Sequence, residues 1–249
     1  MDEADSRQQR AILSQLLKLE AQPTAPPIPT GFAALDKALA GGLPRGRIVE
    51  LYGPSSCGKT TVALQIAADA QCAGSSVAWI DAERAFDPEY AASTGVTLDR
   101  LVVVQPDSAE QALAIAYQLA SSAAVDLLIV DSAAALVPEL ELQTDLGVQS
   151  EGLQSRVMAS GLRRLDYALR RFQAVALFLN QTRTFLLQDG PAERSAGGAP
   201  LKLHAAVRIA LAPVTAGRSR FRIVKSRVTN AFSEGELAPS TRPDLAKTR

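Results

Sequence analysis

Apolar runs alternate with stretches of helical spacing along the middle of the chain, from Arg47 onward. The run Leu127–Val130 is the clearest, with four consecutive large aliphatic side chains. Near-continuous apolar runs of this length are typical of parallel strands that helices cover on both faces. The pattern predicts an α/β fold, a mostly parallel twisted sheet flanked by helices. The predicted strands are 47–52, 76–81, 101–105, 126–131 and 174–180, and the predicted helices are 60–73, 87–94, 108–122 and 154–172.

The two ends of the chain have different patterns. Residues 6–20 have apolar positions at helical spacing and predict a short amphipathic helix, which should dock on this domain or on a neighbouring subunit. The proline-rich segment 21–31 is expected to be a linker, and 233–249 a disordered tail, so the predicted core spans 32–232. Residues 203–213 and 219–227, with Ala216-Gly217 between them, predict a C-terminal antiparallel hairpin.

Residues 53–60 fit the phosphate-binding template G-x-x-x-x-G-K-[ST] at every fixed position. A predicted strand precedes this loop and a predicted helix follows it, so free backbone N–H groups would point at phosphate oxygens. Lys59 would place its charge on the β- and γ-phosphates, and the Thr60 hydroxyl would ligate Mg²⁺. A glycine-rich turn that contains Lys-Thr by coincidence is the alternative. The predicted ATP-binding residues of the loop are Gly53, Pro54, Ser55, Ser56, Cys57, Gly58, Lys59, Thr60 and Thr61.

Carboxylates follow two of the predicted strands. Asp131 ends the strand 126–131, and beside a phosphate-binding loop such a residue holds Mg²⁺, often through water. Asp81 and Glu83 follow the strand 76–81 at the same sheet edge. Glu83 would be the general base that polarises the water attacking the γ-phosphate, and a helix-starting acidic turn is the alternative.

Two further places suggest nucleotide contacts. Asp87 and Tyr90 open a predicted helix, where Tyr90 would stack on the nucleobase and Asp87 would accept a hydrogen bond from it. Both residues are equally compatible with surface capping. The strand 174–180 ends in two amides, Asn180 and Gln181, and Gln181 would sense the γ-phosphate and act on the following loop.

With these motifs in order, the chain resembles the RecA recombinase family. The resemblance runs from about residue 30 to about residue 230. It implies a RecA-like P-loop NTPase core, with Glu83 as hydrolytic base and Gln181 coupling ATP to DNA. The matching stretches are 42–50, the phosphate-binding loop with Pro54, 80–83, 87–91, 105–107, 110–113, 125–136, 180–181 and 197–198.

The resemblance also implies DNA contacts. Residues 139–152 and 182–199 match the two DNA-binding loops of the family, which are mobile until they meet single-stranded DNA. The first is acidic here, which weakens a role in phosphate contact. The second carries Arg183, Phe185 and Arg194, a cationic and aromatic mixture that suits a single strand. A solvated insertion is the alternative for either loop.

Two cations late in the chain complete the resemblance. Family members carry basic residues at the positions of Lys225 and Arg227, which reach the γ-phosphate bound by the adjacent subunit. A cation supplied in this way works only in an assembly. Alternating cations also protect exposed strand edges, which is the alternative.

Composition and charge limit the remaining choices. Residues 1–155 carry 9 Lys and Arg against 20 Asp and Glu, and residues 156–249 carry 17 against 6, so balances of −11 and +11 cancel. This asymmetry indicates a polyanion-binding C-terminal half or a head-to-tail self-contact, although uneven surface charge is also possible. The two cysteines give no zinc or disulfide pattern, and His204, in a strand-like run, is expected to be structural. The chain shows neither a transmembrane run nor a signal peptide, so no membrane partner and a cytoplasmic location are expected.

Two hypotheses of different classes follow. The first is a protein of recombination, repair and the SOS response to DNA damage that binds single-stranded DNA and hydrolyses ATP as an oligomer. The second is an accessory protein of translesion synthesis, like the ImuA group, which binds DNA, RecA or a translesion polymerase with little or no ATPase activity. The sequence retains the four predicted site residues Lys59, Glu83, Asp131 and Gln181, which favours the first hypothesis. The family's N-terminal strand is replaced here by the linker 21–31, and its C-terminal domain has no counterpart in the sequence, which favours the second. A small-metabolite kinase would need a lid that the loop 182–199 does not resemble.

Overall fold

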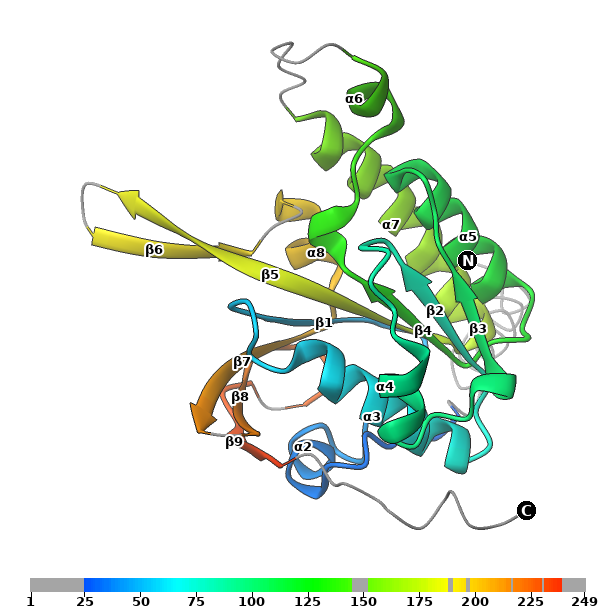
Figure 1. Ribbon diagram of the computed structural model, residues 1–249, viewed down its shortest axis with the longest axis vertical. Helices are drawn as coiled ribbons and strands as arrows, with labels where there is room; N and C mark the ends of the chain where they lie inside the picture. The colour runs from blue at the N-terminus through cyan, green and yellow to red at the C-terminus, as the bar shows by residue number, and fades with distance from the viewer. Residues whose placement is uncertain are drawn as a thin grey trace, which may run out of the picture.

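A sheet of nine strands organises the part of the chain that the computed structural model describes, residues 25–144, 152–187, 190–195, 198–215, 217–229 and 231–238 (Figure 1). The strand order is β3-β2-β4-β5-β1-β7-β8-β9, and β6 pairs with the far end of β5. The strands are β1 Ile48–Gly53, β2 Val77–Asp81, β3 Leu101–Val104, β4 Leu127–Asp131, β5 Val175–Leu187, β6 Gly190–Ser195, β7 Val207–Thr215, β8 Arg218–Ser226 and β9 Glu234–Leu237.

Helices cover both faces of the sheet (Figure 1). On one face α3 and α2 enclose a core with Val49 and Leu51 of β1, and on the other α5, α7 and α8 enclose a core with Ile48. The helices are α2 Ala33–Ala38, α3 Lys59–Cys72, α4 Pro88–Ser93, α5 Ala109–Ser121, α6 Glu139–Gln143, α7 Leu153–Phe172 and α8 Gly198–His204, with short 3₁₀ turns η1 Leu98–Arg100 and η2 Ala133–Ala135.

The sheet has the predicted α/β architecture. Strands β3, β2, β4, β5, β1 and β7 are parallel. Strands β7 and β8 form the predicted antiparallel hairpin. Because the carboxyl ends of parallel strands meet at one edge, Gly53, Asp81, Asp131 and Gln181 come to the same side of the sheet. No described helix is both long enough and apolar enough to cross a membrane.

The structure corrects the sequence prediction in the second half of the chain. Within the segment 182–199, predicted as a mobile loop, residues 182–187 continue β5 and residues 190–195 form β6, which pairs with them in an antiparallel ladder. Residues 203 and 204, predicted as strand, end helix α8 instead, so His204 is helical. Leu201 and Ala205 of this segment are buried at a spacing of four, which explains the helix.

The predicted ends of the core also change. The disordered tail predicted from residue 233 is wrong for 234–237, which form β9 because Leu237 is fully buried beside Phe221 and Ile223. At the other end, Ile28 pairs with Leu43 and joins the same core, so part of the predicted linker is anchored. The predicted helix 6–20 lies outside the described residues.

Candidate functional site

The predicted phosphate-binding loop connects β1 to α3. Gly58 precedes the helix in a left-handed conformation with φ of 91°, which glycine adopts without a steric penalty. Gly53 ends the strand where a Cβ atom would lie 2.2 Å from the carbonyl oxygen of Leu211, so this position also requires glycine. Strand, loop and helix therefore have the order that a phosphate-binding loop needs.

Lys59 and Thr60 open the helix with polar contacts inside the site. The Lys59 ammonium donates to the carbonyl oxygens of Gly53, at 3.2 Å, and of Pro54, at 2.7 Å. It therefore lies across the loop, on the side where phosphate oxygens would bind. The Thr60 hydroxyl donates to Asp131 Oδ2 at 3.1 Å, so the two predicted magnesium ligands are direct neighbours.

Asp131 is held in an unfavourable electrostatic environment. Burial, together with the nearby negative charge of Glu83, raises the pKa of its carboxyl from the ordinary 3.8 to about 6. A hydroxyl and a carboxylate are hard oxygen donors of the kind Mg²⁺ prefers, and a divalent cation would relieve the repulsion between the two carboxylates. The residues present therefore fit a magnesium ion.

Glu83 lies in a small polar cluster beside Asp131. The Ser132 hydroxyl donates to Glu83 Oε1, and Gln181 Nε2 donates to the same oxygen at 3.2 Å. Glu83 remains exposed, so water reaches its carboxylate. The sequence predicted Glu83 and Gln181 as separate features, and the structure places them in direct contact.

Asp81 does not lie among the site carboxylates, although the sequence placed it with Glu83 at the same sheet edge. It is 1% exposed and accepts hydrogen bonds from the backbone N–H groups of Ala85 and Phe86 and from Gln105 Nε2. These contacts fix the turn that presents Glu83. Asp81 thus orders the loop and does not face the site.

Asp87 and Tyr90 open α4 close to the loop. Asp87 Oδ1 accepts from the backbone N–H groups of Glu89 and Tyr90, so the capping alternative describes this carboxylate. The Tyr90 hydroxyl lies 2.7 Å from Thr61 Oγ1, and Tyr90 is 42% exposed. Tyr90 borders a hollow of about 490 Å³, together with Arg218 and Leu237.

A second cavity, of about 330 Å³, brings the predicted catalytic and metal residues together. It lies at the carboxyl edge of β1, β4 and β5, next to the hollow at Tyr90, and Ser56, Gly58 and Thr61 border both. Its lining residues are Ser55, Ser56, Gly58, Lys59, Thr60, Thr61, Glu83, Asp131, Ser132 and Gln181. The 330 Å³ cavity is lined mainly by polar residues, and the hollow beside it is bordered by Tyr90.

Lys225 and Arg227 do not reach this cavity. Lys225 pairs with Arg208, which pairs with Glu50, three residues before the loop begins at Gly53. Lys225 donates to the carbonyl oxygens of Lys202 and Leu203, and Arg227 Nη2 donates to that of Leu203, so both cations hold the last turn of α8. Partial burial and the neighbouring Arg227 and Arg208 lower the pKa of Lys225.

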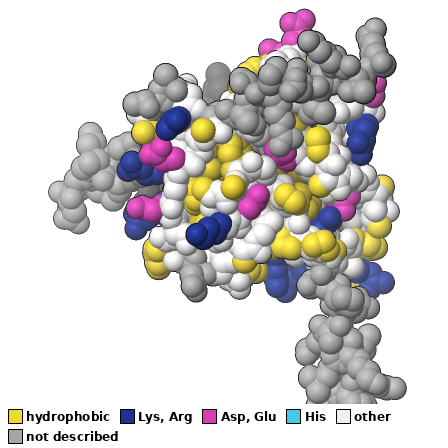
Figure 2. Space-filling model, turned by 90° about the horizontal axis from the view of Figure 1, so that it is seen from below, with side chains coloured by type: hydrophobic (Ala, Val, Ile, Leu, Met, Phe, Trp, Pro, Cys, Tyr) yellow, Lys and Arg dark blue, Asp and Glu magenta, His cyan; other side chains and the backbone are white. Residues whose placement is uncertain are grey.

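The predicted DNA-binding residues are only partly described. The backbones of Arg183 and Arg194 face each other across the β5–β6 ladder, and that of Phe185 faces Ala192. Their side chains lie outside the described residues. On the face in Figure 2, basic and acidic side chains are interspersed with apolar ones, so the described part of this face carries no continuous basic surface.

Sequence reasoning missed two features. Ser132, directly after the predicted metal ligand, is one of them. The other is a buried group in which Glu50 accepts hydrogen bonds from Asn180 and Arg208. The sequence signals for this group were a charged residue within each of two otherwise apolar strands and the amide of Asn180 at the end of a third.

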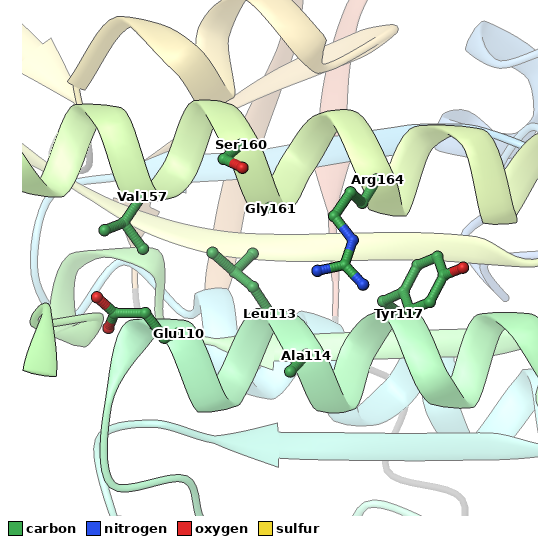
Figure 3. A pocket seen from close by; sticks show the side chains of 8 residues that line it. All are labelled: Glu110, Leu113, Ala114, Tyr117, Val157, Ser160, Gly161 and Arg164. Carbon is green, nitrogen blue, oxygen red and sulfur yellow. The ribbon is translucent and has the colours of Figure 1, made fainter.

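A hollow between α5 and α7, shown in Figure 3, lies apart from the site. Its volume is about 230 Å³. Gly161 forms part of it, because a Cβ atom there would lie 2.5 Å from Leu113. Arg164 lies 4.7 Å from the centre of the Tyr117 ring at one end. None of its lining residues also lines the 330 Å³ cavity, so this hollow is separate from the candidate site.

We expect Asp131→Asn to stabilise the protein without magnesium at pH 7–8 by about 1–3 kcal/mol. The pKa is raised from 3.8 to about 6, so the folded state holds the proton more tightly than the unfolded state. The ionised carboxylate therefore lowers stability above pH 6, and that penalty fades as pH falls toward 4. Urea denaturation of both proteins at pH 4, 6 and 8 measures the difference. An equal difference at all three values would contradict this explanation.

The comparisons with known proteins all indicate similarity to RecA proteins. A family model described as the RecA N-terminal domain matches residues 9–239. The chain is 48% identical over 221 residues to Protein RecA of Mycobacterium avium, an alignment that covers 84% of this chain and 63% of the relative. It is 46% identical over 229 residues to Protein RecA of Nocardia farcinica, covering 88% and 66% of the two chains. The chain thus spans somewhat less than two thirds of the M. avium relative's length.

Proposed function

The chain belongs to the RecA family, and from that premise we propose that it is an ATP-binding, single-stranded-DNA-binding protein of recombination and repair. In this role ATP binding and hydrolysis change its affinity for DNA. It acts in the cytoplasm during the SOS response to DNA damage. The single observation that carries the proposal is the 330 Å³ cavity, where Lys59, Thr60, Asp131, Glu83 and Gln181 converge.

Each residue has a role in this proposal that its geometry supports. The loop N–H groups and the Lys59 ammonium bind the phosphates, and Thr60 and Asp131 would hold Mg²⁺, which neutralises charge on the β- and γ-phosphates when bound. Glu83, exposed to water, orients the attacking water and accepts its proton. Gln181 donates to Glu83, so a γ-phosphate near Gln181 would compete for that amide.

The ring of Tyr90 is the proposed support for the nucleobase. It borders the 490 Å³ hollow and its hydroxyl is fixed by Thr61. Asp87 is engaged in capping α4, so its proposed hydrogen bond to the base would have to use the carboxylate oxygen that does not cap.

DNA binding is assigned to the β5–β6 ribbon, the antiparallel pair that residues 182–187 of β5 form with residues 190–195 of β6. Gln181 directly precedes the ribbon, so the nucleotide site and the ribbon share one strand. Arg183, Phe185 and Arg194 would supply charge for the DNA backbone and a ring for the bases. Phosphate contacts release counterions, so the affinity for single-stranded DNA should decline with salt.

An oligomer is part of the proposal because Lys225 and Arg227 lie away from this chain's own loop. We expect the double variant Lys225→Ala/Arg227→Ala to bind nucleotide as the parent does and to lose DNA-stimulated ATP hydrolysis by about 10-fold or more. Arg220→Ala/Arg222→Ala on the same strand is the matched control. Loss of nucleotide affinity in dilute protein, or equal turnover in both double variants, would contradict a role between subunits.

The accessory alternative predicts little or no turnover. Similarity to proteins named RecA is a reason to prefer the recombinase over that alternative. The deciding experiment measures ATP hydrolysis with and without single-stranded DNA, while light scattering follows assembly. DNA-stimulated hydrolysis with growth of the particles supports the proposal. Nucleotide binding without turnover at saturating DNA would instead support the accessory alternative, in which the protein binds RecA or a translesion polymerase.

A further inference from the structure

A carboxylate lies completely buried in the centre of the sheet. Glu50, in the middle of β1, is 0% exposed and lies between β5 and β7. Asn180 Nδ2 donates to Glu50 Oε1 at 2.8 Å, and Arg208 Nε donates to Glu50 Oε2. Arg208 in turn lies over the ring of Tyr52, 4.4 Å from its centre. We call Glu50, Asn180 and Arg208 the buried cluster.

Stability alone does not account for the buried cluster. Removing two charges from water costs several kcal/mol per ion, and replacing a buried ion pair by apolar side chains of similar volume is often neutral or stabilising. Leucine or methionine at these positions would continue the apolar cores that surround them. We therefore look for a role of the buried cluster other than stabilising the fold.

Two members of the buried cluster, Asn180 and Arg208, flank along the chain the segment that carries the β5–β6 ribbon and α8. At the start of this segment, Asn180 Oδ1 accepts the backbone N–H of Gln181 at 2.9 Å, and the Gln181 side chain reaches Glu83. At its end, α8 packs into the same core as Ile48 of β1. The carbonyl oxygens of its last turn are held by Lys225, which pairs with Arg208 in the ladder.

We propose that Glu50 is a positioning residue, which joins Asn180 and Arg208, the residues on either side of the segment that carries the ribbon and α8, so that Gln181 and the ribbon move together. This inference rests on the proposed function, because it assigns Glu50 a part in the coupling between nucleotide binding at Gln181 and DNA binding at the ribbon. Glu50 touches neither nucleotide nor DNA in this assignment. It acts through Asn180 on one side and Arg208 on the other.

The test replaces the charged pair with apolar residues in the double variant Glu50→Leu/Arg208→Met, which keeps volume and avoids leaving one charge alone. The readout is the ratio of single-stranded-DNA dissociation constants measured with ADP and with a non-hydrolysable ATP analogue. In the parent protein we expect this ratio to be about 10 or more, within the usual range of coupling between sites. In the double variant we expect it to fall to about 1–2, with nucleotide affinity within about 3-fold of the parent.

Controls separate positioning from mere structural support. Asp126→Asn weakens the Arg45–Asp126 ion pair, which lies at the opposite edge of the sheet, and should leave the ratio unchanged. Glu50→Gln is a second variant, in case the double variant does not fold, and it should lower the ratio in the same direction. A folded variant that keeps the parent ratio overturns the inference, as does a parent protein that binds nucleotide and shows no coupling. A parent protein that binds no nucleotide refutes the proposed function itself.

Discussion

Lys59→Ala is expected to lower the affinity for ATP by roughly 10²–10⁴-fold, because the ammonium makes charge-assisted contacts worth about 1.5–3 kcal/mol each. In the structure this ammonium donates to the carbonyl oxygens of Gly53 and Pro54. Loss of those two bonds removes only a modest part of the folding free energy, because the Lys59 side chain is half-buried and the loop keeps its glycines. Titration with a fluorescent ATP analogue measures the affinity.

The matched control for this variant is Lys37→Ala. Lys37 is exposed on α2 and borders neither cavity of the site, so its removal changes net charge equally and should leave ATP affinity as it was. Thermal unfolding of both variants shows that the fold is kept. If Lys59→Ala bound ATP as tightly as the parent protein, the proposed role of this loop in phosphate binding would be wrong.

The strand-loop-helix arrangement of β1 and α3 and the sheet were predictable because both depend on local sequence. The template fixes the loop at Gly53, Gly58, Lys59 and Thr60, and continuous apolar runs mark the central strands wherever helices cover both faces. The convergence of Asp131, Glu83 and Gln181 followed from a rule of topology, that parallel strands end at one edge. The structure adds that Glu83 and Gln181 share a hydrogen bond.

Other features were not predictable from local sequence because long-range contacts decide them. Asp81 and Glu83 are two residues apart and look alike in the sequence, yet backbone N–H groups of the following turn bind Asp81 alone. Residues 182–187 and 190–195 form a ribbon because each strand gains its hydrogen bonds from the other. Glu50 reads as a surface residue until its partners on β5 and β7, more than a hundred residues away, are in place.

Glu83→Gln is expected to lower ATP turnover by roughly 10²–10⁴-fold while nucleotide affinity stays within a few-fold of the parent. The amide keeps the size of the side chain and still accepts from Ser132 and Gln181, but it cannot take a proton from water. Burial is the main cause of the raised pKa of Asp131, and the same change removes the Glu83 charge that adds to it, so that pKa should fall part of the way toward its ordinary value. Single-turnover hydrolysis measures the first effect, and the pH dependence of stability the second.

Glu89→Gln is the matched control, since this exposed carboxylate on α4 is outside the lining of both site cavities. A general base that is lost cannot be replaced by saturating DNA, so the defect of Glu83→Gln should persist at every DNA concentration. If Glu83→Gln turned over ATP at the parent rate, hydrolysis would have to use a base other than Glu83. If turnover fell but DNA restored it, Glu83 would act on DNA coupling through Gln181, and the proton would be taken elsewhere.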